Sequence, residues 1–147
     1  MVAWMIATAL AAVQPGADGR WTWTLYESGD GGQIVLANEI PDTASLRATL
    51  ECQPGSGAAR VAVYGMEAEA GYVAIHAGEA RTAAQGDVVE EAGVERLTAA
   101  LRLDHPVFAA FVETGRLSLV QGESRWSVRV PAAQRSLITD FAVACGG

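Results

Sequence analysis

Short runs in which apolar and polar residues alternate recur along most of the chain, and glycine- or proline-rich turns separate them. Alternation with a period of two places every second side chain on the same face of a strand. Because such short turns join consecutive strands directly, we expect mainly antiparallel pairing. The predicted strands cover residues 21–28, 33–38, 45–52, 59–64, 94–103, 116–121 and 125–130, with shorter and weaker ones at 72–76 and 80–84.

Two segments near the C-terminus carry helical signals instead. Asp104 is a good N-cap, Pro106 suits the first helical turn, and Gly115 can end the helix in a left-handed conformation. Pro131 is expected to open a second helix over residues 132–144. The predicted fold class is therefore α+β: a mainly antiparallel β-sheet with a short internal helix and a C-terminal helix.

The N-terminal segment bears on the compartment. Residues 1–13 are apolar apart from Thr8. This run is shorter than the roughly 20 residues that cross a bilayer as a helix, and it suits the apolar region of a secretory signal, with a cleavage site at Ala9–Ala11. No Lys or Arg precedes the apolar run, and a buried first strand or helix is the alternative.

This interpretation divides the chain into two parts. We expect residues 1–17 to be a signal peptide followed by a flexible mature N-terminus. Residues 18–147 are expected to form one β-rich domain, which is an ordinary size for a single domain. The predicted location is periplasmic or secreted, with no transmembrane span in the mature protein.

The two cysteines are both expected to face the core. Cys52 ends an alternating apolar run that begins at Leu46, so all members of that run would share one strand face. Cys145 follows Leu137 and Phe141 at a spacing of four, which places the three on one helix face. Two core-facing thiols in an oxidising compartment commonly form a disulfide. Two unpaired buried thiols are the alternative.

The ten basic residues are all arginine, and seventeen acidic residues give a formal net charge of −7. A chain without lysine has no P-loop lysine, Schiff-base lysine or Ser-Lys nucleophile pair. An acidic chain is also a poor match for nucleic acid or an anionic membrane. We therefore expect neither as a partner.

Charge is unevenly distributed along the sequence. Residues 116–135 contain four arginines and one acid. Residues 66–95 contain one base, Arg81, and seven acids: Glu67, Glu69, Glu79, Asp87, Glu90, Glu91 and Glu95. One interpretation is a solvated acidic flank, with arginines on the outer face of a hairpin. The other is an acidic patch that docks a basic protein partner, or self-association through the unlike patches.

Motifs for catalysis, metals or cofactors are missing from the sequence. No G-x-S-x-G, H-E-x-x-H or C-x-x-C motif occurs. The Gly-Ser-Gly segment at 55–57 lacks the third glycine of a dinucleotide fingerprint, so we interpret it as a turn. Glu27, Asp30 and Glu39 lack the order of a calcium-binding loop. We predict no cofactor and no metal site.

The remaining candidate residues fit structural roles. His76 is expected on the exposed face of its strand, and His105 as a surface or capping residue at a helix start. Core-facing thiols are poor nucleophiles. Trp21 and Trp23 share a strand face and could stack a ligand, but we expect them in the core. We predict that the protein is not an enzyme; a hydrolase that uses paired carboxylates is the alternative.

The order of features offers one resemblance to a known family. The positions that carry it are Trp21, Trp23, Leu46, Leu50, Cys52, Phe108, Phe111, Leu117-Ser118-Leu119 and residues 137–145. In this order the chain resembles small exported bacterial domains related to the VasI-like type VI secretion-associated proteins. The resemblance implies a periplasmic β-rich fold with a Cys52–Cys145 bridge, and it implies no catalytic residues. The family's F-x-L-x-G segment before the last helix is here W-S-V-R-V-P, at 126–131.

Taken together, the sequence predicts an exported, non-enzymatic interaction domain of the bacterial envelope, monomeric or weakly dimeric. The alternative is an inhibitor or immunity-type protein that blocks a secreted hydrolase through the acidic segment at residues 66–95.

Overall fold

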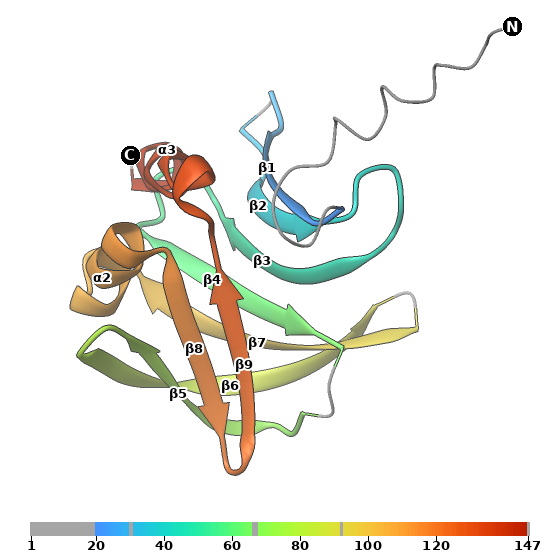
Figure 1. Cartoon of the computed structure of the whole chain (residues 1–147), viewed down its shortest axis with the longest axis vertical. Coiled ribbons are helices and arrows are strands. Elements are labelled where there is room, and N and C mark those ends of the chain that lie inside the picture. Colours follow the sequence, from blue (N-terminus) through green and yellow to red (C-terminus); the bar gives the residue numbers. More distant parts are fainter. Residues whose placement is uncertain (1–19, 30, 66–67, 92, 147) are drawn as a thin grey trace, which may run out of the picture.

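The computed structural model describes residues 20–29, 31–65, 68–91 and 93–146, and within them nine strands form one antiparallel sheet (Figure 1). The strands are β1 (Thr22–Glu27), β2 (Ile34–Glu39), β3 (Leu46–Cys52), β4 (Ala58–Tyr64), β5 (Gly71–Ala77), β6 (Ala80–Glu91), β7 (Val94–Arg102), β8 (Arg116–Gln121) and β9 (Ser124–Arg129). The helices are α2 (Pro106–Thr114) and α3 (Ser136–Gly146), with a 3-10 turn at Ala132–Gln134. The predicted α+β class is confirmed. The predicted signal peptide and flexible N-terminus, residues 1–17, lie outside the described residues.

The strand order is β1-β2-β3-β4-β7-β6-β5-β8-β9, and β6 divides the sheet into two halves. Residues 80–86 of β6 pair with β5, and residues 87–91 pair with β7. Gly86, at the changeover, is buried: a Cβ there would lie 2.5 Å from Val73 Cγ2 and 2.8 Å from the Gly71 carbonyl oxygen. We call β1, β2, β3, β4, β7 and the end of β6 the first half-sheet. The start of β6 with β5, β8 and β9 is the second half-sheet.

The sheet curls so that its two edge strands approach each other at the helical end (Figure 1). The Trp23 indole N–H of β1 donates to the Arg129 carbonyl of β9 at 2.9 Å. The Gln134 side-chain amide accepts from the Trp23 backbone N–H at 3.4 Å and donates to the Trp23 carbonyl at 3.3 Å. Gln134 thus satisfies edge backbone groups of β1 that a neighbouring strand would otherwise pair.

One hydrophobic core fills the inside of the curl and extends under both helices. It takes alternate residues from every strand, such as Leu36, Leu50 and Ile75, all fully buried. In α2, Phe108 and Phe111 pack edge to face with ring centroids 6.0 Å apart. Figure 1 shows α2 and α3 together at one end of the sheet. The second half-sheet and the first therefore share a single core.

The predicted disulfide between Cys52 and Cys145 is confirmed, with the two Cα atoms 5.9 Å apart. It joins the end of β3 to the last turn of α3. The Gly57 backbone N–H also donates to the Cys145 carbonyl at 3.2 Å, so the turn at residues 55–57 lies against the end of α3. The bridge holds α3 against the first half-sheet.

Two strand predictions need correction. The weak strand predicted at 80–84 continues to Glu91, because β6 pairs first with β5 and then with β7. Leu46 does not share the core face of Ala48: the β2–β3 register shifts between Asn38 and Glu39, so Ala48 pairs with Asn38 but Leu46 pairs with Glu39. The irregularity turns Leu46 towards the outer face.

The helix starts also differ from the prediction. The N-cap of α2 is His105, not Asp104: His105 is extended with ψ 144°, and its Nδ1 accepts from the Val107 N–H at 3.0 Å. Pro106 imposes this, because the residue before a proline avoids the helical region. Asp104 accepts two hydrogen bonds from Arg102, at 2.9 and 2.7 Å. The last helix is not continuous from 132, because its first turn is 3-10 and α3 begins at Ser136.

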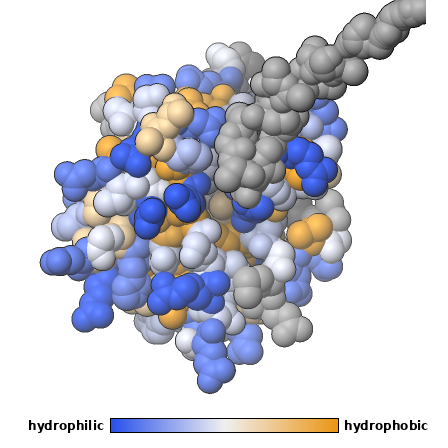
Figure 2. Space-filling model, viewed as in Figure 1, coloured by the Kyte–Doolittle hydropathy of each residue, from blue (hydrophilic) through white to orange (hydrophobic). Residues whose placement is uncertain are grey.

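Trp21 and Trp23 do not form an exposed stacking pair. Trp23 is buried in the core, and the Arg47 guanidinium lies 4.1 Å from the centroid of a half-buried Trp21 ring. Within the described residues, no helix is long and apolar enough to span a membrane. In the view of Figure 2, hydrophilic side chains cover most of the surface and hydrophobic ones form small, separate patches.

Candidate functional site

Three glutamates line one cleft at the end of the sheet away from the helices, and two of them belong to the predicted acidic segment. The cleft has a volume of about 670 Å³ and lies between the β4–β5 connection, the start of β7 and the β8–β9 turn. Its carboxylates belong to Glu69, Glu95 and Glu123, one from each segment. We call it the acidic cleft. All three side chains are exposed, so their charges are available to solvent and to a partner.

The position of Glu69 is fixed by the neighbouring strand. The Gln121 side chain at the end of β8 accepts from the Glu69 N–H at 3.1 Å and donates to the Glu69 carbonyl at 2.6 Å. The β6–β7 hairpin supplies Glu95, which stands directly opposite Glu90 in the register. Like charges directly opposite on antiparallel strands are destabilising. The hairpin therefore presents negative charge at a cost in stability.

The other predicted acids lie elsewhere or outside the described residues. Glu67 is outside them, and Glu91 is described only in its backbone. Asp87 pairs with Thr98 and lies on the opposite face of β6 from Glu90, since the two are three residues apart. Glu79 is in the β5–β6 turn, next to Gly78, which lies close to Ala110 of α2. Of the predicted acids, Glu69 and Glu95 thus line the acidic cleft, Glu90 stands opposite Glu95, and Glu79 and Asp87 lie elsewhere.

Sequence reasoning did not assign Glu123 to this site. It is the single acid within the arginine-rich stretch 116–135, and its hairpin turn reaches the cleft because β8 pairs with β5. That pairing joins strands that are far apart in the sequence. No local pattern in the sequence marks it.

A second, smaller groove of about 370 Å³ lies on the outer face of the first half-sheet. Its polar side chains bond to one another. Tyr26 donates to Glu39 Oε2 at 2.6 Å, and this hydrogen bond raises the pKa of the Tyr26 phenol above its usual value. Arg96 donates to Glu51 Oε2 at 2.9 Å and to the Tyr64 hydroxyl at 3.2 Å.

Arg96 and Glu51 are largely buried: about 14% of the Arg96 side chain and 13% of the Glu51 side chain are exposed. Burial alone would lower the pKa of Arg96, but the hydrogen bonds with Tyr64 and Glu51 outweigh it and raise the pKa. The guanidinium is therefore held charged and balances one of the two carboxylates that line the groove, while the other, Glu39, accepts a hydrogen bond from Tyr26.

The residues that would serve nucleophilic or metal chemistry lie apart from both grooves. His105 caps α2, both cysteines are in the disulfide, and His76 lies on the outer face of β5 opposite Arg81. In the described part of the chain, no three His, Cys, Asp or Glu residues are grouped so as to hold a metal ion. The acidic cleft is suited to electrostatic attraction of a cationic group.

Comparisons with known proteins leave the family open. No family model, no curated protein and no solved structure matches the chain. The resemblance to the VasI-like proteins accordingly stays a prediction, carried by the residues quoted for it.

Proposed function

We propose that this protein is an exported, non-enzymatic interaction domain of the bacterial envelope, and that a basic protein partner docks on the acidic cleft. The observation that supports this most directly is the convergence of Glu69, Glu95 and Glu123 from three separate segments on one cleft of about 670 Å³. The described residues that line the cleft include three carboxylates and no basic side chain, so they make a negative potential there that a cationic surface would neutralise.

The register of the β6–β7 hairpin supports the same proposal. Glu90 opposite Glu95 weakens the hairpin, so the pair is not explained by folding. A bound cationic group would relieve this repulsion. Long-range attraction would also speed encounter with the partner, and salt would screen it over a Debye length of about 8–10 Å.

Export is the second part of the proposal. The Cys52–Cys145 disulfide is compatible with an extracytoplasmic compartment, and we propose the periplasm. The intact mass of protein recovered from the native host should be lower than the full-length mass by about 11 residues, the length that a signal peptide cut after Ala11 would remove. Full-length protein in the cytoplasmic fraction would contradict export.

Two triple variants test the cleft with the same change of net charge. E69Q/E95Q/E123Q removes the cleft carboxylates, and E27Q/E79Q/E113Q removes three exposed carboxylates elsewhere. Envelope proteins retained by the wild type are identified first, and association rates are then measured against salt. We expect the cleft variant to associate about tenfold more slowly at low salt and to lose most of its salt dependence, while the control variant behaves like the wild type. Unchanged binding by the cleft variant would mean that the cleft is only a solvated surface.

The same experiment distinguishes a general interaction domain from an inhibitor or immunity-type protein. An inhibitor would retain one secreted hydrolase in a one-to-one ratio and block its activity. A basic partner without hydrolase activity, lost from the cleft variant, would favour the interaction domain.

A further inference from the structure

The outer face of the second half-sheet contains a shallow depression of about 280 Å³ between β8 and β9. Two arginines and two serines line it: Arg116 and Ser118 from β8, Ser127 and Arg129 from β9. The register pairs Arg116 with Arg129 and Ser118 with Ser127. Cross-strand partners lie about 4.5–5.5 Å apart at Cβ, and residues two apart on a strand lie about 7 Å apart. The four side chains therefore stand at the corners of one small rectangle.

Within the part of the chain that the structure describes, these four side chains have no partner. Neither guanidinium group forms an ion pair or a side-chain hydrogen bond there, and neither serine hydroxyl is hydrogen-bonded. Two arginines directly opposite each other on antiparallel strands repel, which lowers stability. Like the glutamate pair of the β6–β7 hairpin, this pair is not explained by folding.

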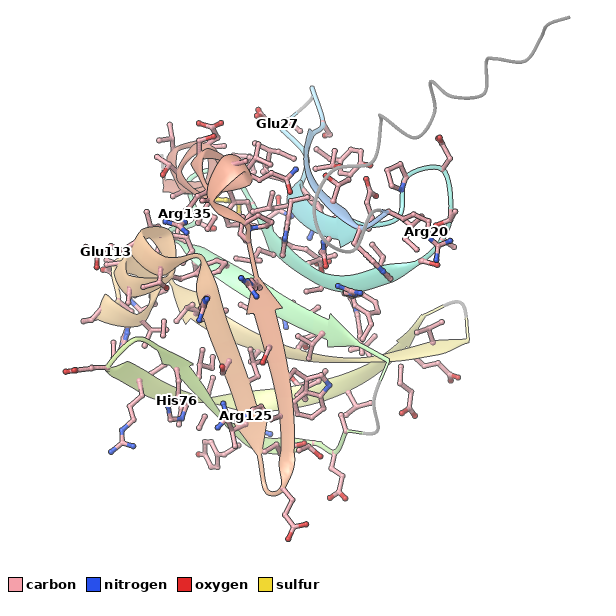
Figure 3. All side chains as sticks on the ribbon, viewed as in Figure 1. Arg20, Glu27, His76, Glu113, Arg125 and Arg135 are labelled. Atoms are coloured by element: carbon pink, nitrogen blue, oxygen red, sulfur yellow. A yellow bond between two sulfur atoms is a disulfide. The ribbon has the colours of Figure 1, made fainter. Side chains whose placement is uncertain are left out.

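Two further arginines, Arg81 and Arg125, add positive charge to the surrounding face. His76 pairs with Ser118 on one side and with Arg81 on the other, and Val120 pairs with Arg125. Figure 3 shows His76 and Arg125 over the lower part of this half-sheet, and Glu113 at the helical end. The outward positions of the strand residues 71–86, 116–121 and 124–129, as the register assigns them, include no acid. Asp87 is the next outward residue of β6, where the strand has passed to β7, and Glu79 and Glu123 are in the turns.

We propose that this depression binds the phosphate or sulfate group of an anionic ligand. A tetrahedral oxyanion accepts hydrogen bonds from several directions at once. Two guanidinium groups, which are planar forks of N–H donors, and two hydroxyl groups can supply them. Charge-assisted hydrogen bonds of this kind are about twice as strong as neutral ones. A bound dianion would also remove the repulsion between Arg116 and Arg129.

The site fits a single oxyanion group rather than a long anionic polymer. The whole chain has a net charge of −7, which repels an extended anionic polymer, whereas one phosphate group meets only the cationic face. This inference uses different residues from the acidic cleft, so it does not depend on the function proposed above.

Inorganic phosphate is the probe for the test, with sodium chloride at matched ionic strength as the blank. Titration should shift the backbone amide resonances of Ser118 and Ser127 and raise the thermal midpoint, since a ligand that binds only the folded state stabilises it. R116Q/R129Q should weaken phosphate binding about tenfold or more, and S118A/S127A about threefold. The matched control R81Q/R125Q removes two arginines from the same face but outside the depression, and it should keep binding within about twofold of the wild type.

Two results would overturn the proposal. One is a phosphate response no larger than that of chloride. The other is an equal loss in R81Q/R125Q and R116Q/R129Q, which would mean diffuse attraction to the whole face. Vesicles of phosphatidylglycerol, compared with phosphatidylcholine, identify the source of the group. Binding to both phosphate and the anionic vesicles supports a lipid headgroup at the site, and binding to phosphate alone supports a soluble phosphate ester.

Discussion

On the outer face of the first half-sheet, polar and charged side chains bond to one another, whereas on the outer face of the second half-sheet Arg116 and Arg129 have no ion-pair partner among the described residues. Tyr26 pairs with Glu39, and Arg96 joins Glu51 to Tyr64 across three strands. On the other face, Arg116 and Arg129 stand opposite each other with no acid between them. The two faces belong to one sheet over one core, but only on the first are the charged side chains held by hydrogen bonds to neighbouring side chains.

This difference separates side chains that hold the fold together from those available to a ligand. A charged group that is half-buried and hydrogen-bonded contributes to stability, because its removal leaves its partner without compensation. An exposed arginine beside another arginine contributes nothing of this kind. We expect such an arginine to act in binding, and replacing it should leave the free energy of unfolding unchanged or raise it.

The largest expected effect concerns the disulfide that closes the core shared by the two half-sheets. C52A/C145A removes the bridge that closes a separation of 93 residues, and the chain-entropy model gives a loss of about 4–5 kcal/mol in the free energy of unfolding. Urea unfolding of the variant, followed by tryptophan fluorescence, measures it. One cooperative transition at a lower midpoint would confirm that both half-sheets unfold together. An unchanged midpoint would mean that α3 is held without the bridge.

The next largest effect concerns the strand that the two half-sheets share. In G86A the new Cβ would meet the Gly71 carbonyl oxygen at 2.8 Å and Val73 Cγ2 at 2.5 Å, so the backbone of β5 or β6 must move. We expect a loss of about 1–3 kcal/mol in the free energy of unfolding. G29A is the control, because nothing lies within 4 Å of a Cβ there. Equal stability of the two variants would show that β6 needs no glycine to pass between the halves.

The individual strands and the disulfide could be predicted from the sequence, because both depend on local patterns. Alternation identified seven strands within a few residues, and the spacing at Cys52 and Cys145 correctly directed both thiols to the core. The full length of β6 could not be predicted, since Gly86 interrupts the alternation and the strand changes its partner there. Leu46 was misplaced because a register shift with β2 reverses its face, and a single strand's pattern does not contain its partner's register.

The candidate sites were less predictable for the same reason. The count of acids in 66–95 indicated a negative surface, but Glu123 joins it only through the pairing of β8 with β5. The arginine-rich stretch indicated a hairpin face, but Arg81 of β6 and His76 of β5 also lie on that face. Each site is an edge or face to which distant strands contribute, and local sequence does not specify which strands meet.

A smaller effect separates the two outer faces directly. R96Q and R116Q each remove one positive charge, from the bonded face and the unbonded face respectively. R96Q leaves the half-buried Glu51 carboxylate without this guanidinium, and we expect a loss of about 1–3 kcal/mol in the free energy of unfolding. R116Q should change it by no more than about 0.5 kcal/mol. Chemical denaturation of both variants measures the difference. Comparable losses of unfolding free energy in R96Q and R116Q would mean that the two faces do not differ in what they contribute to stability.

The smallest expected effect concerns a single proton on the bonded face. The hydrogen bond from the Tyr26 phenol to Glu39 holds its pKa above the usual value, because ionising the phenol would break the bond and set two negative charges side by side. In E39Q the amide oxygen can still accept the bond but carries no charge, so the pKa should fall back towards its usual value. Carbon NMR of labelled tyrosine follows the titration, with Y26F assigning the signal. Because Tyr26 is exposed, we expect no measurable change in stability near neutral pH. If the Tyr26 pKa were the same in E39Q and the wild type, the two side chains would not be bonded in solution, and this end of the first half-sheet would resemble the unpaired face.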